Sequence, residues 1–183
     1  ERQRAEQLLG HREAGQQALE IGRALDRAGR PCYGWNRSPA TVDAATAAGH
    51  DADTDLTAVL GRAARDDALV VVATPTPTVG AILDQVARHA PACALTDVVS
   101  VKQAVADAVA EHGLSARFVG GHPMAGTSQS GWDATDPDLF VGAPWVVCTD
   151  DDADPAVWED VADVALAVGT RVVPCLLYTS DAA

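Results

Sequence analysis

A histidine set among glycines is the residue of this chain best suited to chemistry. His122 follows the apolar pair Phe118 and Val119 and two glycines, and Pro123 comes directly after it. An imidazole titrates near neutral pH, so it can accept and release a proton within one turnover. The glycines allow close approach of a ligand or of another backbone segment, and the proline restricts the direction in which the chain leaves. The pattern indicates proton transfer at His122, although a histidine packed in an ordinary loop would show the same spacing.

The elements that must position this histidine are predicted to alternate between helices and strands. The continuous apolar run at residues 68–73 is typical of a strand buried on both faces of a parallel sheet. Apolar spacing and capping signals predict helices at residues 14–28, 40–48, 56–64, 78–89, 102–112 and 155–168. Further strands are predicted at residues 31–35, 94–98, 143–148 and 171–173, and in the segment that leads into His122. This alternation predicts an α/β fold with a doubly wound, mostly parallel, Rossmann-like sheet.

Four polar loops follow predicted strands. In an open parallel sheet, ligands bind outside the carboxyl ends of the strands. We therefore expect these loops to line one crevice, with the histidine among them. The loops are residues 36–38, 74–76, 97–102 and 121–123.

Composition excludes several classes of partner. Acidic residues number 26 against 13 lysines and arginines, a formal charge of −13, which disfavours nucleic acid and anionic membranes as partners. No apolar run approaches the roughly 20 residues of a membrane span. The four cysteines form no C-x-x-C pair, so neither a metal site nor a disulfide scaffold is indicated. We interpret the acidic residues 149–155 as a solvated loop, and we expect a cytoplasmic location.

Five motifs follow one another along the chain: YGWNRS at 33–38, VVVATP at 70–75, TDVVSVK at 96–102, GGHPMAGT at 120–127 and LFVGAPW at 139–145. In this order they resemble the prephenate dehydrogenase family, which includes arogenate dehydrogenases, over about residues 21–174. The resemblance implies NAD(P)-dependent oxidative decarboxylation in tyrosine biosynthesis. The substrate would be prephenate, giving 4-hydroxyphenylpyruvate, or arogenate, giving tyrosine. A homodimeric parent protein is also implied.

The resemblance assigns catalytic roles to two residues. His122 is similar to the family's catalytic histidine, which accepts the proton of the substrate hydroxyl as hydride leaves for the nicotinamide. Ser100 is similar to a serine that hydrogen-bonds within the same site, and a role as the N-cap of the following helix is a compatible alternative. Lys102 either orients this loop or is solvated.

Cofactor contacts are predicted at the ends of the strands. Arg37 follows a strand at the place of the adenosine ribose, where NAD-binding enzymes usually have an acidic residue. Its guanidinium suits a 2′-phosphate, so we expect NADP, with NAD as the alternative; a solvated surface arginine is the other interpretation. No metal is expected. The predicted cofactor-binding residues are Gly15, Asn36, Arg37, Ser38, Ala73, Thr74, Pro75, Asp97 and Val98.

Both ends of the chain depart from the family pattern. Residues 1–20 lack the G-x-G-x-x-G turn that lies against the cofactor pyrophosphate, and Gly15 alone matches it. No apolar run precedes it, so the first strand and its turn are expected to be atypical. We interpret residues 1–20 as an atypical N-terminal segment, 21–174 as the nucleotide-binding domain and 175–183 as a non-native tail. The family's C-terminal helical dimerisation domain is expected to be absent.

Two other functions remain open at this point. An NADP-dependent dehydrogenase of the hydroxyacid type would share the loop at residues 36–38. Alternatively, the chain is an inactive fragment without catalysis, because the pyrophosphate turn and the helical domain do not match the family.

Overall fold

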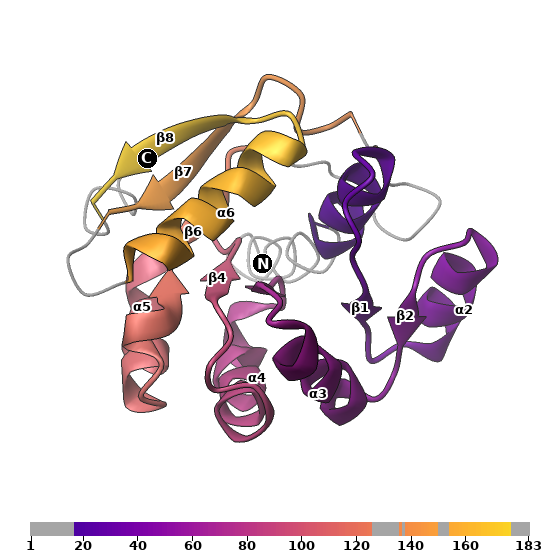
Figure 1. Cartoon of the computed structure of the whole chain (residues 1–183), viewed down its shortest axis with the longest axis horizontal. Helices are drawn as coiled ribbons and strands as arrows, with labels where there is room; N and C mark the ends of the chain where they lie inside the picture. Colours follow the sequence, from indigo (N-terminus) through magenta and orange to yellow (C-terminus); the bar gives the residue numbers. More distant parts are fainter. Residues whose placement is uncertain (1–16, 126–135, 137, 150–153, 177–183) are drawn as a thin grey trace, which may run out of the picture.

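Helices and strands alternate along the chain (Figure 1). The structure, a computed structural model, describes residues 17–125, 136, 138–149 and 154–176. The helices are residues 17–27, α2 (Pro39–Ala47), α3 (Leu56–Asp66), α4 (Thr76–His89), α5 (Lys102–Glu111), the 3-10 turn η1 (Ser115–Arg117) and α6 (Pro155–Ala167). The strands are β1 (Gly34–Trp35), β2 (Ala52–Asp53), β3 (Val70–Val72), β4 (Leu95–Asp97), β5 (Phe118–Val119), β6 (Gly121–Pro123), β7 (Pro144–Cys148) and β8 (Arg171–Cys175).

Most strand pairs are parallel, as the sequence predicts. β1 pairs with β2, and β3, β4 and β5 form a second parallel sheet in that order. A third sheet joins β6, β7 and β8, in which β6 runs antiparallel to β7 and β8 runs parallel to it. The α/β class with a mostly parallel, Rossmann-like sheet is therefore confirmed.

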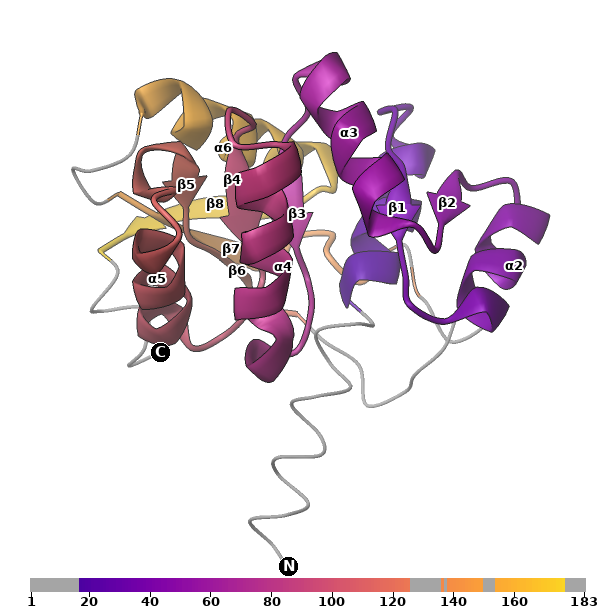
Figure 2. The ribbon, with the colours of Figure 1, turned by 90° about the horizontal axis from the view of Figure 1, so that it is seen from below.

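Two apolar cores lie on opposite faces of the sheet formed by β3, β4 and β5. One core joins α3, α4 and α5 to the sheet through residues such as Leu83 and Val105. The other joins helix 17–27, β7 and α6 through residues such as Ile21, Trp145 and Val161. Figure 2 shows α4 and α5 in front of this sheet and β7, β8 and α6 behind it. Since helices cover both faces, the fold is doubly wound.

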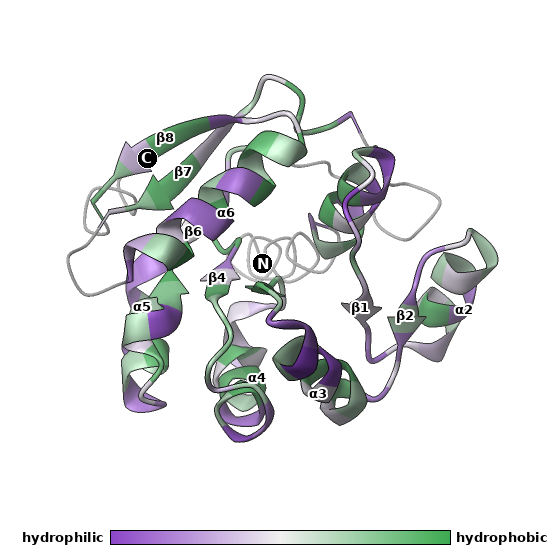
Figure 3. Cartoon of the chain, in the orientation of Figure 1, coloured by the Kyte–Doolittle hydropathy of each residue, from purple (hydrophilic) through white to green (hydrophobic). Residues whose placement is uncertain are grey.

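Local sequence signals account for where the helices begin. Asp55 caps α3, because its carboxylate accepts the Ala58 amide at 3.1 Å, and Asp154 caps α6 in the same way. A carboxylate at this position pairs an amide that the helix leaves unsatisfied. Hydrophobic and hydrophilic stripes alternate around the helices that these caps start (Figure 3).

Three strand predictions differ from the structure. β2 was not expected, since a two-residue strand ending in an exposed aspartate has no apolar run to reveal it. The strand predicted at 31–35 is limited to two residues. The segment leading into the histidine is two strands, because the chain leaves one sheet at β5 and enters another at β6.

Gly120 and Gly121 make this change of sheet sterically feasible. A Cβ on Gly120 would lie 3.0 Å from Cys148 Sγ. A Cβ on Gly121 would lie 2.7 Å from the Asp97 carbonyl oxygen and 3.0 Å from Trp145 Nε1. At Gly121 the backbone approaches its neighbours so closely that a side chain would collide with them, and at Gly120 a side chain would be tightly packed, so the glycines serve packing at this point.

Substitution of Gly121 by alanine is expected to lower the free energy of unfolding by about 1–3 kcal/mol, because the added methyl meets backbone that cannot move away freely. Gly80→Ala is the matched control: Gly80 lies inside α4 and a Cβ there meets nothing within 4 Å. That variant should be more stable than the original chain by about 0.5–1 kcal/mol. Denaturant unfolding of both variants checks this, and equal effects would contradict the close approach at Gly121.

Candidate functional site

Three of the segments predicted to form the site lie at the carboxyl ends of parallel strands, and the fourth is a strand. Asn36 directly follows β1, Ala73 directly follows β3, and Asp97 is the last residue of β4. His122 is the central residue of β6, opposite Val146 of β7. Three of the four predicted loops thus lie at the carboxyl ends of parallel strands, as expected for a ligand site in this class of fold. The loop predicted at residues 121–123 is instead strand β6, which follows β5 after Gly120 and runs antiparallel to β7.

Asp97 and Lys102 form an ion pair that is sealed from solvent. Their side chains are 0% and 1% exposed. Asp97 also accepts hydrogen bonds from the Val99 amide at 3.0 Å and the Gly121 amide at 3.2 Å. Lys102 Nζ donates to the Gly121 carbonyl oxygen at 2.6 Å. One ion pair therefore connects the end of β4, the first residue of α5 and the first residue of β6.

This arrangement decides between the two interpretations of Lys102. The solvated interpretation is wrong, because the side chain is buried and paired. Lys102 orients the loop before α5 through Asp97 and holds the strand of the histidine through Gly121. Asp97 is also a predicted cofactor contact. In the structure its carboxylate is buried and already hydrogen-bonded to the Val99 and Gly121 amides.

His122 follows Gly121, whose amide and carbonyl groups are both hydrogen-bonded to the ion pair, and its imidazole is suited to accepting a proton. Its ring is half-buried, and Nδ1 has no hydrogen-bond partner among the described residues. Burial lowers the pKa of His122 from its ordinary value of 6.5, and the nearby Lys102 charge lowers it further, against an opposing effect of Asp97. The imidazole is therefore neutral at physiological pH, the form that acts as a general base.

Ser100 lies on the surface between Asp97 and α5. The helix begins at Lys102, its N-cap is Val101, and no side chain caps it. Ser100 is therefore not the helix cap, and its hydroxyl is exposed at the carboxyl end of β4. Val98, also a predicted contact, is 1% exposed and its side chain packs in the core.

The loop after β1 holds its polar groups in a tight turn. Asn36 accepts the Ser38 amide at 2.9 Å, and Ser38 caps α2 by accepting the Thr41 amide at 3.4 Å. Arg37, between them, is exposed. The turn thus presents a guanidinium beside a helix N-terminus, an arrangement that suits a phosphate group.

Thr74 supplies an unsatisfied polar group at the end of β3. Its Oγ1 is buried and has no hydrogen-bond partner within the described part of the chain. Pro75 follows as the N-cap of α4, and its carbonyl accepts the Thr78 hydroxyl at 2.8 Å. A buried hydroxyl without a partner is uncommon in folded proteins, so this strand end fits a polar ligand such as a nucleotide.

The structure brings some of the predicted site residues close together and places others in a separate part of the fold. Asp97, Lys102 and His122 form one group. The loop at Asn36 belongs to the separate β1–β2 pair, and no hydrogen bond among the described residues links it to His122. Gly15 lies outside the described residues, as do residues 1–16 and 177–183.

One contact near the histidine was missed by the sequence analysis. Gln17 donates through Nε2 to the carbonyl oxygen of Ala125 at 3.1 Å, so helix 17–27 is tied to the segment just after β6. The two residues are 108 positions apart, and nothing in either local sequence signals the contact.

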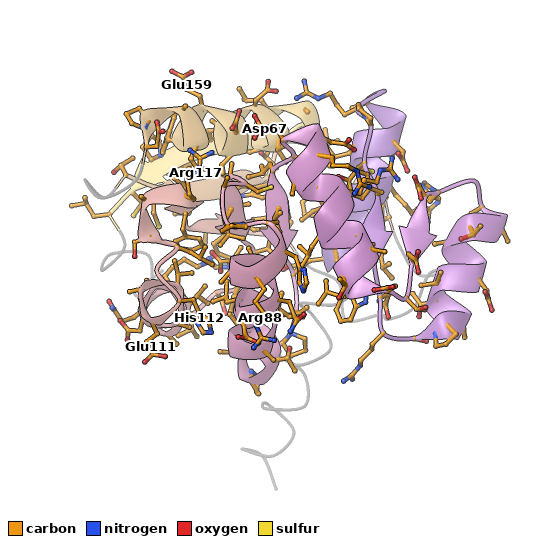
Figure 4. All side chains as sticks on the ribbon, turned by 60° about the horizontal axis from the view of Figure 1, so that its bottom comes forward. Asp67, Arg88, Glu111, His112, Arg117 and Glu159 are labelled. Atoms are coloured by element: carbon orange, nitrogen blue, oxygen red, sulfur yellow. The ribbon has the colours of Figure 1, made fainter. Side chains whose placement is uncertain are left out.

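Charged and titratable side chains also lie near the opposite, amino-terminal ends of the strands. Figure 4 shows Arg88 at the end of α4, Glu111 and His112 at the end of α5, and Arg117 just before β5. The ring of His112 contacts the Ala108 carbonyl oxygen at 2.7 Å within its own helix. This histidine is therefore occupied locally, as expected near a helix C-terminus.

In the part of the chain that the structure describes, no three His, Cys, Asp or Glu side chains gather where they could hold a metal ion. Every helix in these described residues is too short or too polar to span a lipid bilayer.

The titration of His122 gives a direct prediction. NMR titration should show His122 losing its proton below pH 6.5, because burial and Lys102 disfavour the charged ring. The unfolded chain binds this proton more tightly, so His122 should lower the free energy of unfolding as pH falls below 6.5. His122→Asn identifies the resonance, and a midpoint at or above 6.5 would contradict the described environment.

Comparison with protein families gives a match over most of the chain. The family described as "Prephenate dehydrogenase, nucleotide-binding domain" matches residues 21–174. A prephenate dehydrogenase of Bacillus subtilis is 34% identical over 113 residues, which are 60% of this chain and 30% of that protein. The match to the family confirms the resemblance that the five motifs indicate.

Solved structures agree in fold. A protein of Corynebacterium glutamicum, described as a candidate prephenate dehydrogenase, is 43% identical with a TM-score of 0.84 over 89% of this chain and 53% of its own. Prephenate dehydrogenase of Aquifex aeolicus, solved with hydroxyphenyl propionate and NAD⁺, is 24% identical with a TM-score of 0.79 over 90% of this chain and 58% of its own. This chain thus spans little more than half of those chains, and the second likeness concerns the fold alone.

Proposed function

The chain belongs to the prephenate dehydrogenase family and matches the nucleotide-binding domain of that family. We propose that the whole protein catalyses the NAD(P)-dependent oxidative decarboxylation of prephenate or arogenate. The product is 4-hydroxyphenylpyruvate or tyrosine. The half-buried imidazole of His122 carries this proposal: its Nδ1 has no hydrogen-bond partner among the described residues, and it follows Gly121, which is hydrogen-bonded to a buried ion pair. The names of the relatives support the substrate class.

In this proposal His122 accepts a proton from the hydroxyl group of the substrate ring. Hydride leaves the carbon that bears this hydroxyl, the ring carboxylate departs as carbon dioxide as the ring becomes aromatic, and the phenolate oxygen formed in this way takes the proton back from His122. When bound, the nicotinamide ring of the cofactor would accept this hydride. The hydrogen bonds of Asp97 and Lys102 to Gly121 fix the backbone next to His122. Ser100, which is exposed after the end of β4, offers a hydroxyl to the same substrate.

The cofactor is proposed to lie along the ends of β1, β3 and β4. Arg37, beside the N-terminus of α2, binds the 2′-phosphate of NADP, so NADP is preferred over NAD. The unpaired hydroxyl of Thr74 bonds a polar group of the cofactor at the end of β3. The backbone of residues 97–98 and the turn at Asn36 and Ser38 complete the contact. Residues 21–174 would constitute this nucleotide-binding domain.

The remaining parts of the function lie beyond this domain. We propose that a helical domain completes the substrate pocket and forms the homodimer, because this chain spans 53% of the Corynebacterium glutamicum chain and 30% of the Bacillus subtilis protein. The non-native tail predicted at residues 175–183 is proposed for residues 176–183, because Cys175 is the last residue of β8 and pairs with Cys148 of β7. Titrating NADP and NAD against the isolated chain tests the alternative of an inactive fragment, which predicts no binding of either.

Substitution of His122 by asparagine in full-length protein should lower kcat about 10²- to 10⁴-fold, because the group that takes the proton is removed. KM should change little, since asparagine keeps a polar side chain of similar reach. His112→Asn is the matched control and should keep the original rate, because its ring bonds within α5. Steady-state formation of NAD(P)H measures both, and a normal rate for His122→Asn would refute its assignment.

The cofactor preference depends on one exposed cation. Arg37→Ala should weaken NADP binding about tenfold or more, as expected for loss of a charge-assisted hydrogen bond, and leave NAD binding unchanged. Arg65, another exposed arginine at the end of α3, is the control and should affect neither cofactor. Equilibrium fluorescence titration measures both affinities. An equal loss for the two cofactors would show that Arg37 does not recognise the 2′-phosphate.

A further inference from the structure

The strand that carries His122 has one edge against β7 and one edge that faces away from it. On the β7 side, the amide of Met124 donates to the carbonyl oxygen of Pro144 at 2.9 Å. Because alternate residues of a strand bond to the same neighbour, Gly121, Pro123 and Ala125 direct their backbone groups away from β7. The outward edge of β6 and of the residues just after it therefore depends on other elements for its hydrogen bonds.

Side chains hold this outward edge on both sides of His122. Before the histidine, the buried ion pair bonds to the amide and the carbonyl group of Gly121. Pro123 has no amide hydrogen to pair. After it, the carbonyl oxygen of Ala125 accepts a hydrogen bond from Nε2 of Gln17 at 3.1 Å. The chain that carries His122 is thus fixed at two points, and Gln17 supplies the second of them.

The helix that carries Gln17 is itself firmly packed. Ile21 and Ala24 of helix 17–27 are 3% and 1% exposed and belong to the same core as Trp145 of β7. The side chain of Ala125 packs against this core as well. The hydrogen bond of Gln17 therefore joins two segments that already share a core. A catalytic group is held most precisely when its supports are rigid in this way.

The contact requires a hydrogen-bond donor at position 17. The partner is a carbonyl oxygen, which can only accept, and the amide group of Gln17 donates without bringing a charge. A glutamate has nearly the same shape, but its ionised carboxylate only accepts, so it would repel this oxygen. A methionine has a similar length and no strong donor. Packing alone would tolerate both substitutions, whereas the hydrogen bond is lost in both.

We propose that Gln17 is a positioning residue, which fixes the chain after β6 so that the imidazole of His122 stays where it accepts the substrate proton. This inference rests on the proposed function, because it concerns the same proton transfer. Gln17 acts through the backbone at Ala125 and does not itself take part in the chemistry. A displacement of about 1 Å at a catalytic group can cost up to about 10²-fold in rate.

Steady-state kinetics of full-length protein provide the first test. Gln17→Met and Gln17→Glu should each lower kcat about three- to tenfold, the effect of losing one neutral hydrogen bond. KM for the cofactor and the substrate should stay within about twofold, because the misplaced group acts in the chemical step. Gln85→Met is the matched control and should keep the original kcat, since Gln85 bonds to its neighbour Asp84 within α4. A normal kcat in both Gln17 variants, or a change in KM alone, would overturn the proposal.

NMR titration of the 183-residue chain provides a second readout that needs no activity. Burial is the main cause that lowers the pKa of His122. In Gln17→Met the released chain should expose the ring, so the midpoint of His122 should rise toward 6.5, while Gln85→Met leaves it in place. An unchanged midpoint in Gln17→Met would overturn the positioning role. If full-length protein fails to oxidise prephenate or arogenate, the proposed function fails, and this titration still decides whether Gln17 positions His122.

Discussion

The buried ion pair of Asp97 and Lys102 is the interaction on which the candidate site depends. Removing two charges from water is costly, and the pair is stable only because further hydrogen bonds satisfy both groups. The Val99 and Gly121 amides satisfy the carboxylate, and the Gly121 carbonyl satisfies the ammonium. The pair therefore fixes the relative positions of β4, α5 and β6, and with them the residue next to Gly121, which is His122.

The same geometry explains why glycine stands at position 121 and why the histidine stays neutral. The strand of His122 passes so close to Asp97 and Trp145 that a side chain would collide with them. Burial in this closely packed region is the main cause that lowers the pKa of His122, and the Lys102 charge lowers it further. Packing and acid–base behaviour at this site thus have one physical origin.

Much of the fold could be predicted from local signals, and the order of the motifs indicates which residues are candidates for the site. The valine run of β3 and the aspartate cap of α3 are properties of a few adjacent residues, so sequence reveals them. Other features arise only when folding brings distant residues together. They are the pairing of Asp97 with Lys102, the change of sheet at Gly120 and the contact of Gln17 with Ala125. Their residue types alone are equally typical of surface charges and loops.

A double-mutant cycle on Asp97 and Lys102 tests the central claim most directly. Lys102→Met leaves a buried carboxylate without its cation and should lower the free energy of unfolding by about 3–5 kcal/mol. Adding Asp97→Asn removes that isolated charge, so the double variant should be more stable than Lys102→Met alone, with a coupling energy of about 1–3 kcal/mol. Denaturant unfolding of the four proteins provides the measurement. Losses that simply add would show that the two side chains do not form the buried pair described here.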